Sequence, residues 1–344
     1  MGTNLTPLVE RVRIGLKGLT GKTLAVDALN AIYQFLALVR DPRGGPMRNN
    51  RGMVTSHLIG LATRYSKLAY ENGCKFVFVF DGPPHPFKKR EIERRRETRR
   101  KAFEEYKKYV EAGDYERAFS KAVSSASVDE WVIESSKKLL TLMGYPVVEA
   151  PSDAEAQAAF ITLRGDAWAV SSQDWDSLLY GAPKLVRYVT LTGFEWLPSK
   201  RVARRLEPEL VELEKALKTL GLSRRQLVEV AILSGTDFNE GVKGIGPRKA
   251  YKLIKTYGSL DKLPASIRES LPEGYEELVD LFMNPQVRED YSLEFKEPDC
   301  EALYSFLVEE NSFSPRRVNL IIERLRKSWD KRGLRQGVLE DFLA

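Results

Sequence analysis

The sequence contains two cysteines, two histidines and no long apolar segment in its 344 residues. Cys74 and Cys300 are too few for a disulfide framework and lack the spacing of a zinc site, which favours a reducing compartment. Because the cysteines cannot form such a site, any bound metal must be held by oxygens, and His57 and His85 offer no Ser-His-Asp or Cys-His arrangement for nucleophilic catalysis. The longest apolar runs, such as Phe76 to Phe80, fall far short of the ~20 residues that span a bilayer. We therefore expect a cytoplasmic protein without a membrane partner.

Hydrophobic residues make up 43% of the chain, which is enough to bury a core, so a globular protein is expected. The formal net charge of +6 is mild but favours an anionic partner. Positive charge is concentrated between Lys88 and Lys101, where nine residues are basic and three acidic. Such a segment cannot pack as a core helix. Taken alone, it predicts a solvated or phosphate-attracting helix face.

Short apolar runs alternate with helical patterns over the first half of the chain. Strands are predicted at Lys22 to Val26, Lys75 to Phe80, Pro146 to Glu149 and Ala167 to Val170, and helices at 28–39, 55–71 and 154–163. From Pro208 onward the pattern predicts helices. The alternation indicates an α/β fold with a mainly parallel central sheet covered by helices.

Acidic residues stand just beyond these strands. Asp27, Asp81, Asp174 and Asp176 follow strands, Asp153 and Glu155 begin a helix that follows one, and Asp237 follows a helix. Because the carboxyl ends of parallel strands share one edge of the sheet, these side chains should converge. So many carboxylates repel one another unless cations neutralise them, and oxygen ligands select Mg²⁺ or Mn²⁺. Two such ions, about 4 Å apart, suit the hydrolysis of phosphate esters.

Each carboxylate also has a purely structural interpretation. Ser152 and Glu155 fit a capping box, and Asp174 fits an N-cap for the helix of Leu178 and Leu179. In a helix, residues two apart point to different sides, so Asp153 and Glu155 can share a site only from the first turn. The structural interpretation weakens when all the strand ends are considered together, because each would need its carboxylate for an unrelated reason.

Five segments together resemble the flap endonuclease family of structure-specific 5′ nucleases, close to its archaeal members. They are Val26-Asp-Ala-Leu-Asn-Ala-Ile-Tyr-Gln-Phe35, Phe78-Val-Phe-Asp-Gly-Pro-Pro84, Ala150-Pro-Ser-Asp-Ala-Glu-Ala-Gln-Ala-Ala159, Ser172-Gln-Asp-Trp-Asp176 and Leu233-Ser-Gly-Thr-Asp-Phe238. Each is weak alone, but five in this order are specific and cover essentially the whole chain. The resemblance implies that the seven carboxylates bind metal, although the family commonly carries glutamate at the position of Asp153. The shorter side chain is expected to reach its metal only through water.

The resemblance also implies a function: cleavage of DNA at the base of a single-stranded 5′ flap, with 5′–3′ exonuclease activity, in replication (Okazaki fragment maturation) and repair. Compact length favours flap endonucleases over the larger repair nucleases of the superfamily. Two other classes stay open. An aspartate-dependent phosphatase needs an Asp-x-Asp after the first strand, where Asp27 is followed by Ala28 and Leu29. A clamp-bound DNA scaffold without chemistry is disfavoured by the complete set of carboxylates.

By the same resemblance, a helical arch covers the active site at about 83–130, with Lys88 and Arg95 as its catalytic residues. They lie seven positions apart, two helical turns, so both can face one phosphate. Tyr33, otherwise interpreted as a core aromatic, corresponds to the residue on which the base next to the cut stacks. Stacking of this kind suits a nuclease that ignores sequence.

The glycine-rich stretch 241–249, within a predicted helix-hairpin-helix element at about 233–260, resembles the part of the family that holds duplex DNA, with a monovalent cation. The implied DNA-binding residues are Lys243, Gly244, Gly246, Arg248 and Lys249. Glycines allow backbone N–H groups to approach a phosphate at the start of the next helix. Without the resemblance, an ordinary helix-turn-helix corner is as good an interpretation.

We expect one nuclease domain over 1–331, active as a monomer, and a flexible tail over 332–344. The tail resembles the peptide by which replication proteins dock on a sliding clamp, through Gln336, Leu339, Phe342 and Leu343. Leu343 stands where a second aromatic is usual, which puts the affinity for the clamp in doubt more than the identity of the motif.

Overall fold

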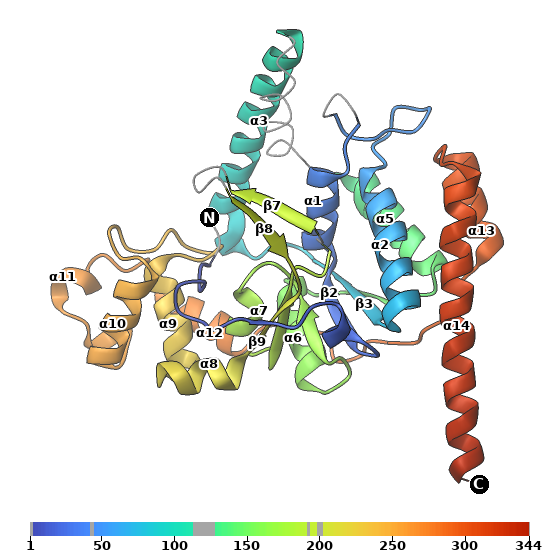
Figure 1. Cartoon of the computed structure of the whole chain (residues 1–344). Coiled ribbons are helices and arrows are strands. Elements are labelled where there is room, and N and C mark those ends of the chain that lie inside the picture. The colour runs from blue at the N-terminus through green and yellow to red at the C-terminus, as the bar shows by residue number, and fades with distance from the viewer. Residues whose placement is uncertain (1–2, 42–44, 113–127, 191–192, 198–201, 344) are drawn as a thin grey trace.

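The structure, a computed structural model, describes residues 3–41, 45–112, 128–190, 193–197 and 202–343. Within these ranges, seven strands form one sheet in the order β1-β9-β6-β5-β2-β3-β4. The five strands from β6 to β4 are parallel neighbours: β6 (Lys184–Arg187), β5 (Ala169–Ser171), β2 (Thr23–Asp27), β3 (Lys75–Phe80) and β4 (Val147–Glu149). The predicted α/β class with a mainly parallel sheet is confirmed (Figure 1).

The strand β3 shows why this sheet forms. After Lys75 its sequence alternates phenylalanine and valine, and side chains of a strand point to alternate faces. Phe76 and Phe78 therefore enter one apolar cluster, while Val77 and Val79 enter another on the opposite face. A strand buried on both faces needs a helical layer on each side of the sheet.

Two helical layers supply that cover. One contains α6 (Ala154–Leu163), α7 (Asp176–Leu179), α8 (Leu213–Leu220), α9 (Arg224–Ser234), α10 (Pro247–Tyr257) and α12 (Tyr275–Met283). The other contains α1 (Ala28–Leu38), α2 (Ser56–Asn72), α5 (Glu130–Leu142), α13 (Cys300–Tyr304), the π-helical turn η4 (Ser305–Glu310) and α14 (Pro315–Leu343). Short elements complete the chain: η1 (Lys17–Leu19), η3 (Leu260–Lys262) and α11 (Ala265–Arg268).

The edge of the sheet differs from the prediction. Helices were expected from Pro208 onward, but Glu209–Glu212 form β9, which is antiparallel to β6 and to β1 (Val12–Arg13). In β9 Glu209 and Val211 are buried while Leu210 and Glu212 are less so, which is the period of two of a strand. Four residues are too few for that period to be distinguished from one helical turn in the sequence. The hairpin of β7 (Gly193–Leu197) and β8 (Val202–Leu206) was also not predicted.

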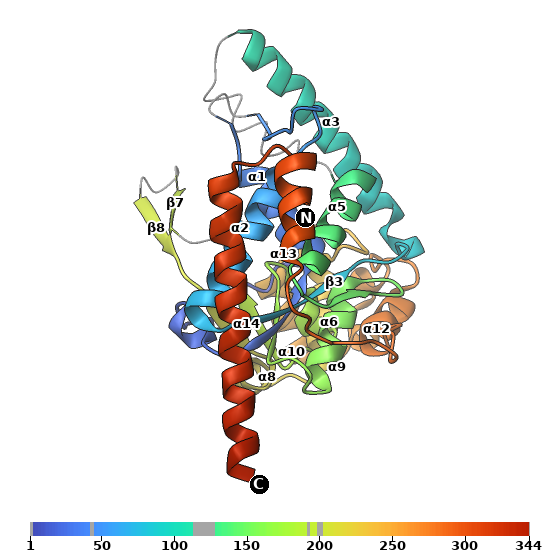
Figure 2. The same cartoon turned by 90° about the vertical axis from the view of Figure 1, so that its right-hand side faces the viewer.

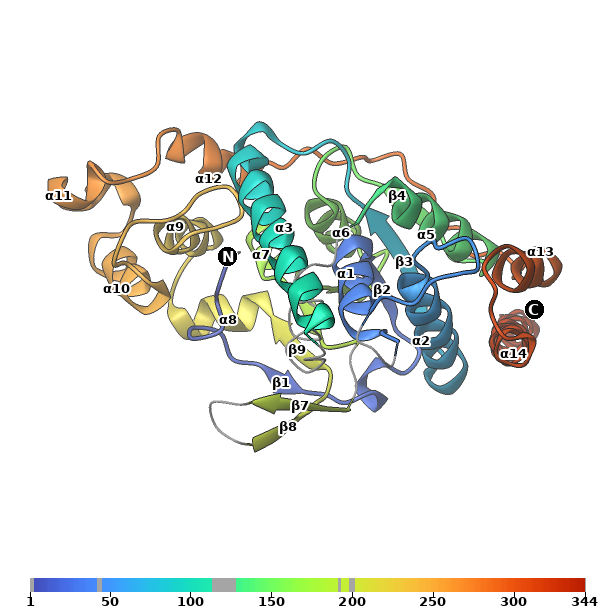
Figure 3. The ribbon, with the colours of Figure 1, turned by 90° about the horizontal axis from the view of Figure 1, so that it is seen from above.

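The basic segment is a helix that projects from the body of the protein. After the turn η2 (Pro86–Lys88), α3 (Lys89–Glu111) extends away from the sheet (Figure 1), and Figure 3 shows it from above. The predicted arch extends to 130, and its part at 113–127 lies outside the described residues. Because α3 has almost no apolar face, ion pairs rather than core packing fix its base, as described below.

The C-terminal helix α14 packs along α2, which is visible in two views (Figures 1 and 2). Its helical backbone continues to Leu343 and so includes most of the segment from 332 that was predicted as a flexible tail. Position 344 lies outside the described residues. None of the helices in the described ranges combines the length and apolar character needed to cross a membrane.

Candidate active site

Two aspartates at adjacent strand ends begin the site and also cap helices. Asp27 ends β2, and its Oδ1 accepts a hydrogen bond from the backbone N–H of Asn30 at 3.0 Å, capping α1. Asp81 follows β3, and its Oδ1 accepts from the backbone N–H of Ala154 at 2.7 Å, at the start of α6. The backbone after Asp81 passes close to the backbone before α6: a Cβ atom at Gly82 would lie 2.3 Å from the carbonyl oxygen of Ala150. The backbone therefore fixes both carboxylates at the carboxyl edge of the sheet.

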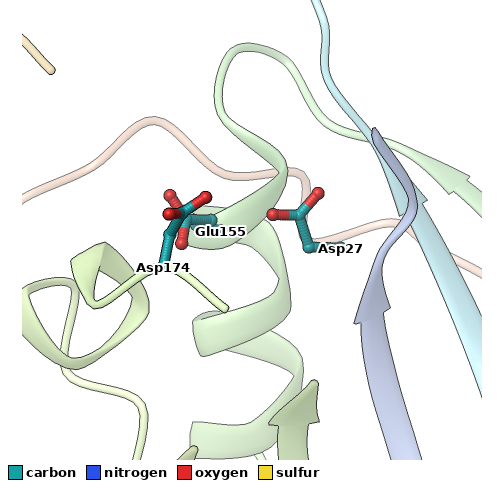
Figure 4. A group of neighbouring side chains, drawn as sticks. All are labelled: Asp27, Glu155 and Asp174. Carbon is teal, nitrogen blue, oxygen red and sulfur yellow. The ribbon is translucent and has the colours of Figure 1, made fainter. Parts of the chain in front are cut away.

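Figure 4 shows three carboxylates that converge at this edge. Asp27 from β2, Glu155 from the first turn of α6 and Asp174 from the loop after β5 each offer an oxygen, and these atoms lie within 4.8 Å of one another. Asp153 is the N-cap residue of α6, so Asp153 and Glu155 do enter the site from the first helical turn. The sequence placed these residues at one edge, and the fold brings this trio together.

The structural interpretations of two carboxylates are wrong. Asp153, not Ser152, is the N-cap residue of α6, and its own side chain makes no capping hydrogen bond. Trp175, not Asp174, is the N-cap residue of α7, again without a side-chain hydrogen bond. These acidic residues are therefore not explained by helix capping.

The carboxylates of the site destabilise one another's charged forms. Burial, and then the charge of Asp81, raises the pKa of Asp27 to about 8. Burial, and then Asp237, raises the pKa of Asp176 to about 7, and burial with Asp176 and Asp174 raises the pKa of Glu155. Burial is also the first cause of the raised pKa values of Asp81 and Asp174. The site as a whole requires added positive charge at neutral pH.

The donor set fits a hard cation. Among the described residues, the buried oxygens Oε1 of Glu155 and Oδ1 of Asp176 have no hydrogen-bond partner in the protein. Buried oxygens without partners are costly unless a ligand satisfies them, and a cluster of carboxylate oxygens is what a divalent metal requires. The acidic cluster is thus compatible with metal binding.

The base of the basic helix contacts two of the carboxylates. The ammonium Nζ of Lys88 donates to Oδ1 of Asp153 at 2.6 Å. The guanidinium of Arg95 donates to both oxygens of Asp237, at 2.6 and 2.7 Å, and its Nε donates to Glu91 at 2.9 Å. The structure therefore places both cations chosen from the sequence directly at the acidic site.

Tyr33 lies on α1 beside this site and is partly exposed, so it is not a core aromatic. The guanidinium carbon of Arg99, on α3, lies 4.9 Å from the centre of its ring. The ring of Tyr33 therefore already makes a cation–π contact with a planar guanidinium group of the basic helix.

Three polar residues of the site were not chosen from the sequence. Asn30 donates to Oδ2 of Asp174 at 2.8 Å and Ser172 donates to Oδ2 of Asp27 at 3.2 Å. The hydroxyl of Tyr180 donates to Oδ2 of Asp153 at 2.6 Å, and burial raises the pKa of this phenol, which therefore keeps its proton. Asn30 and Ser172 could have been suspected from their closeness to Asp27 and to Asp174 in the sequence. Tyr180, far from Asp153 in the sequence, carried no such signal.

The predicted hairpin residues lie in the turn before α10 and in the first turn of α10 itself, at some distance in the chain from most of the carboxylates. Their exposed members are Lys243, Gly244, Gly246, Arg248 and Lys249. Gly244 has a φ of +79°, which favours glycine, whereas Gly246 has an ordinary φ and free space around its missing Cβ. Neither the backbone conformation nor close packing therefore requires a glycine at position 246. Among the described residues, no atom lies within 4 Å of where its Cβ would be, so a ligand could reach the start of α10 there.

A parallel sheet with clustered carboxylates at its carboxyl edge, beneath a strongly basic helix, defines a metal-dependent nuclease. Two family models match the chain: the XPG N-terminal domain over residues 3–102 and the XPG I-region over residues 144–237. The chain is 45% identical over 335 residues to flap endonuclease 1 of Staphylothermus marinus, covering 96% of this chain and 95% of that protein. It is 47% identical to flap endonuclease 1 of Pyrococcus abyssi, covering 95% of each. The chain belongs to the flap endonuclease 1 family.

Solved structures agree. Flap endonuclease-1 from Methanococcus jannaschii superposes with a TM-score of 0.76 at 36% identity, covering 96% of this chain and 100% of that one. The catalytic core of Rad2 in complex with a DNA substrate gives a TM-score of 0.68 at 26% identity, covering 94% and 100%.

Proposed function

We propose that this protein is a structure-specific 5′ nuclease that hydrolyses the DNA backbone near the base of a single-stranded 5′ flap, with 5′–3′ exonuclease activity. The observation that carries the proposal is the convergence of Asp27, Glu155 and Asp174 at the sheet edge. Lys88 and Arg95 pair with two further carboxylates of the acidic site, Asp153 and Asp237. The names of its relatives, flap endonuclease 1, support the same substrate. Its role is in DNA replication, including Okazaki fragment maturation, and in repair.

The carboxylates hold two divalent ions, Mg²⁺ in the cell, with Mn²⁺ able to substitute. Asp27, Glu155 and Asp174 form one group of ligands, and Asp81, Asp153, Asp176 and Asp237 complete the set, Asp153 through water. Bound divalent ions supply an activated water and stabilise the charge that develops on the leaving oxygen. Asn30 and Ser172 orient two of the carboxylates through their hydrogen bonds.

Lys88 and Arg95 act on the scissile phosphate. Both cations now pair with carboxylates, at 2.6 Å in each case. A phosphodiester that enters between them offers a competing anion, and ions on the carboxylates weaken the existing pairs. Cations held beside the reacting phosphate stabilise the charge of the transition state more than that of the bound substrate.

Other surfaces hold the rest of the DNA. Tyr33 stacks on the base next to the cut, and this contact is indifferent to sequence. The hairpin residues Lys243, Gly244, Gly246, Arg248 and Lys249 bind the backbone of the duplex, with a monovalent cation, which positions the junction without reading bases.

The C-terminal end of α14 docks the protein on a sliding clamp. The contact residues proposed are Gln336, Leu339, Phe342 and Leu343. The protein then acts as a cytoplasmic, DNA-associated monomer whose recruitment is separate from its chemistry.

The proposal is tested with labelled flap, gapped and bubble DNA, each incubated in Mg²⁺ and in EDTA. We expect cleavage of the 5′ flap in Mg²⁺ alone. Asp81→Ala should abolish cleavage while flap DNA still binds, because the lost carboxylate serves an ion and not the duplex. Binding without cleavage by the unmodified protein would point to a scaffold, and release of phosphate from a small phosphomonoester without DNA cleavage would point to a phosphatase.

A further inference from the structure

Both oxygens of Asp153 are engaged by other side chains of the protein. Oδ1 accepts from the ammonium of Lys88 and Oδ2 from the hydroxyl of Tyr180, each at 2.6 Å. Asp153 and Tyr180 are 6% and 3% exposed, so water offers little competition for these contacts. Hydrogen bonds to a charged group are stronger than neutral ones, and this carboxylate makes two.

Asp153 differs in this respect from its neighbours. Within the described part of the chain, Glu155 and Asp176 each keep a buried oxygen without a hydrogen-bond partner, and Asp153 is not one of the three residues whose oxygens lie within 4.8 Å of one another. The unsatisfied oxygens indicate where cations are required. Both oxygens of Asp153 already accept hydrogen bonds from the protein, which indicates a role other than direct metal binding.

The donor on the far side of Asp153 is rigidly held. Tyr180 follows α7, its backbone N–H donates to the carbonyl of Asp176 at 2.9 Å, and its ring packs on Phe282 with the centroids 5.0 Å apart. Lys88, by contrast, ends the turn η2 at the foot of α3. Asp153 and Tyr180 line a cavity of about 610 Å³ that also touches His85 and Phe87, and the ammonium of Lys88 lies 4.9 Å from the centre of the Phe238 ring.

From this geometry we propose that Tyr180 is a positioning residue, which holds Asp153 so that Asp153 places the ammonium of Lys88 beside the reacting phosphate instead of binding a metal directly. The inference rests on the nuclease function proposed above. The hydroxyl of Tyr180 fixes Oδ2 of Asp153, and this sets the direction in which Oδ1 accepts from the ammonium of Lys88. Without the hydroxyl, the carboxylate can rotate and Lys88 loses its defined position.

The test begins with Tyr180→Phe, which removes one hydroxyl and keeps the ring on Phe282. We expect kcat on flap DNA at saturating Mg²⁺ to fall about tenfold, the scale of a hydrogen bond to a charged group. KM for the flap and the half-saturating Mg²⁺ concentration should stay within about twofold of the wild type, since Lys88 acts mainly on the transition state. Tyr145→Phe is the matched control, because the buried hydroxyl of Tyr145 donates to the carbonyl of Tyr65 at 3.3 Å, within the core.

Two further measurements separate this role from metal binding. Titration calorimetry with Mn²⁺ on the DNA-free protein should give the same affinity for wild type, Tyr180→Phe and Asp153→Asn. In a Lys88→Ala background, Tyr180→Phe should produce no further loss of kcat, because both changes remove the same contribution.

Weaker Mn²⁺ binding by Tyr180→Phe or Asp153→Asn would show that Asp153 is a direct metal ligand and would overturn the proposal. So would additive losses in the double variant, or wild-type kcat in Tyr180→Phe. If Tyr180→Phe lowers the melting temperature much more than Tyr145→Phe does, Asp153→Asn decides the matter by the same readouts. Failure of the unmodified protein to cut flaps would instead refute the nuclease function.

Discussion

Replacing Asp176 by asparagine should stabilise the metal-free protein while it destroys the active site. Asp176 is 3% exposed at the start of α7, with its Oδ1 unsatisfied and Asp237 as the principal neighbouring charge. Burial and that charge raise its pKa from 3.8 to about 7. The ionised form is therefore disfavoured by the fold, and at neutral pH an uncharged side chain of the same shape should be better tolerated.

The size of the effect follows from the pKa. A change from 3.8 to about 7, at about 1.4 kcal/mol per pH unit, corresponds to about 4 kcal/mol lost from the free energy of unfolding. Local relaxation and entry of water reduce this cost, so we expect a gain of ~2 kcal/mol for Asp176→Asn and a melting temperature higher by ~4 °C.

The dependence on pH has a definite sign. Below about pH 4 aspartate is protonated in both the folded and the unfolded chain, and the two proteins should be equally stable. Between pH 3.8 and about 7 the unfolded chain has lost the proton that the folded chain keeps, so wild-type stability falls as pH rises. Above about pH 7 the cost is complete, and the advantage of the variant is greatest.

Calorimetry in EDTA at pH 5 and pH 8 measures this difference, with the exposed Asp290→Asn as the control for loss of one negative charge. Added Mg²⁺ should raise the melting temperature of the wild type more than that of Asp176→Asn, because binding to the folded state stabilises it. A variant that melts at or below the wild-type temperature in EDTA at pH 8 would contradict the reasoning, and Asp176 would then be stabilised by contacts within the protein.

Three further predictions concern separate surfaces. Lys88→Ala and Arg95→Ala should slow flap cleavage by orders of magnitude with little loss of DNA binding, which single-turnover rates and binding titrations would measure. Loss of affinity without a slower single-turnover rate would show that these residues only attract DNA. Replacing Lys243 and Arg248 by glutamine should do the reverse, weakening binding and making the dependence of log affinity on log salt shallower by up to about one per lost phosphate contact. An unchanged dependence of affinity on salt would show that the hairpin does not contact the DNA backbone. Deleting 336–344 should leave cleavage of free flap DNA unchanged but abolish stimulation by the sliding clamp, and equal stimulation of both proteins in a clamp titration would refute the docking site.

Much of the fold was determined by local patterns in the sequence. The run 75–80, apolar on both faces, could only be a buried strand, and β3 has the predicted bounds. The helix predicted at 154–163 is α6, residue for residue, because strand and helix periods are properties of short segments. The convergence of carboxylates followed from one topological rule, that parallel strands end at one edge.

Edge strands were not determined in this way. β9 and the hairpin β7–β8 are too short for their period to be distinguished, and pairing with a neighbour gives them their structure. The capping interpretations of Glu155 and Asp174 failed for a related reason. A sequence shows which residues could cap a helix, but the backbone direction at the helix start decides which of them does.

Tertiary structure alone decided how the carboxylates divide their tasks. In the sequence Asp153 and Glu155 are two acids of one motif, and both were candidates for metal binding, Asp153 through water. In the fold, Glu155 keeps a bare buried oxygen, whereas Asp153 meets Lys88 and Tyr180. The residues named are distant in the chain, and their hydrogen bonds depend on the positions of η2 and α7 relative to the sheet. The sequence thus determined which chemical groups the site contains. Packing determined which of these groups remain free to bind a cation. The reason is that a hydrogen bond requires a partner atom within about 3 Å, and no local sequence pattern encodes the distance between residues far apart in the chain.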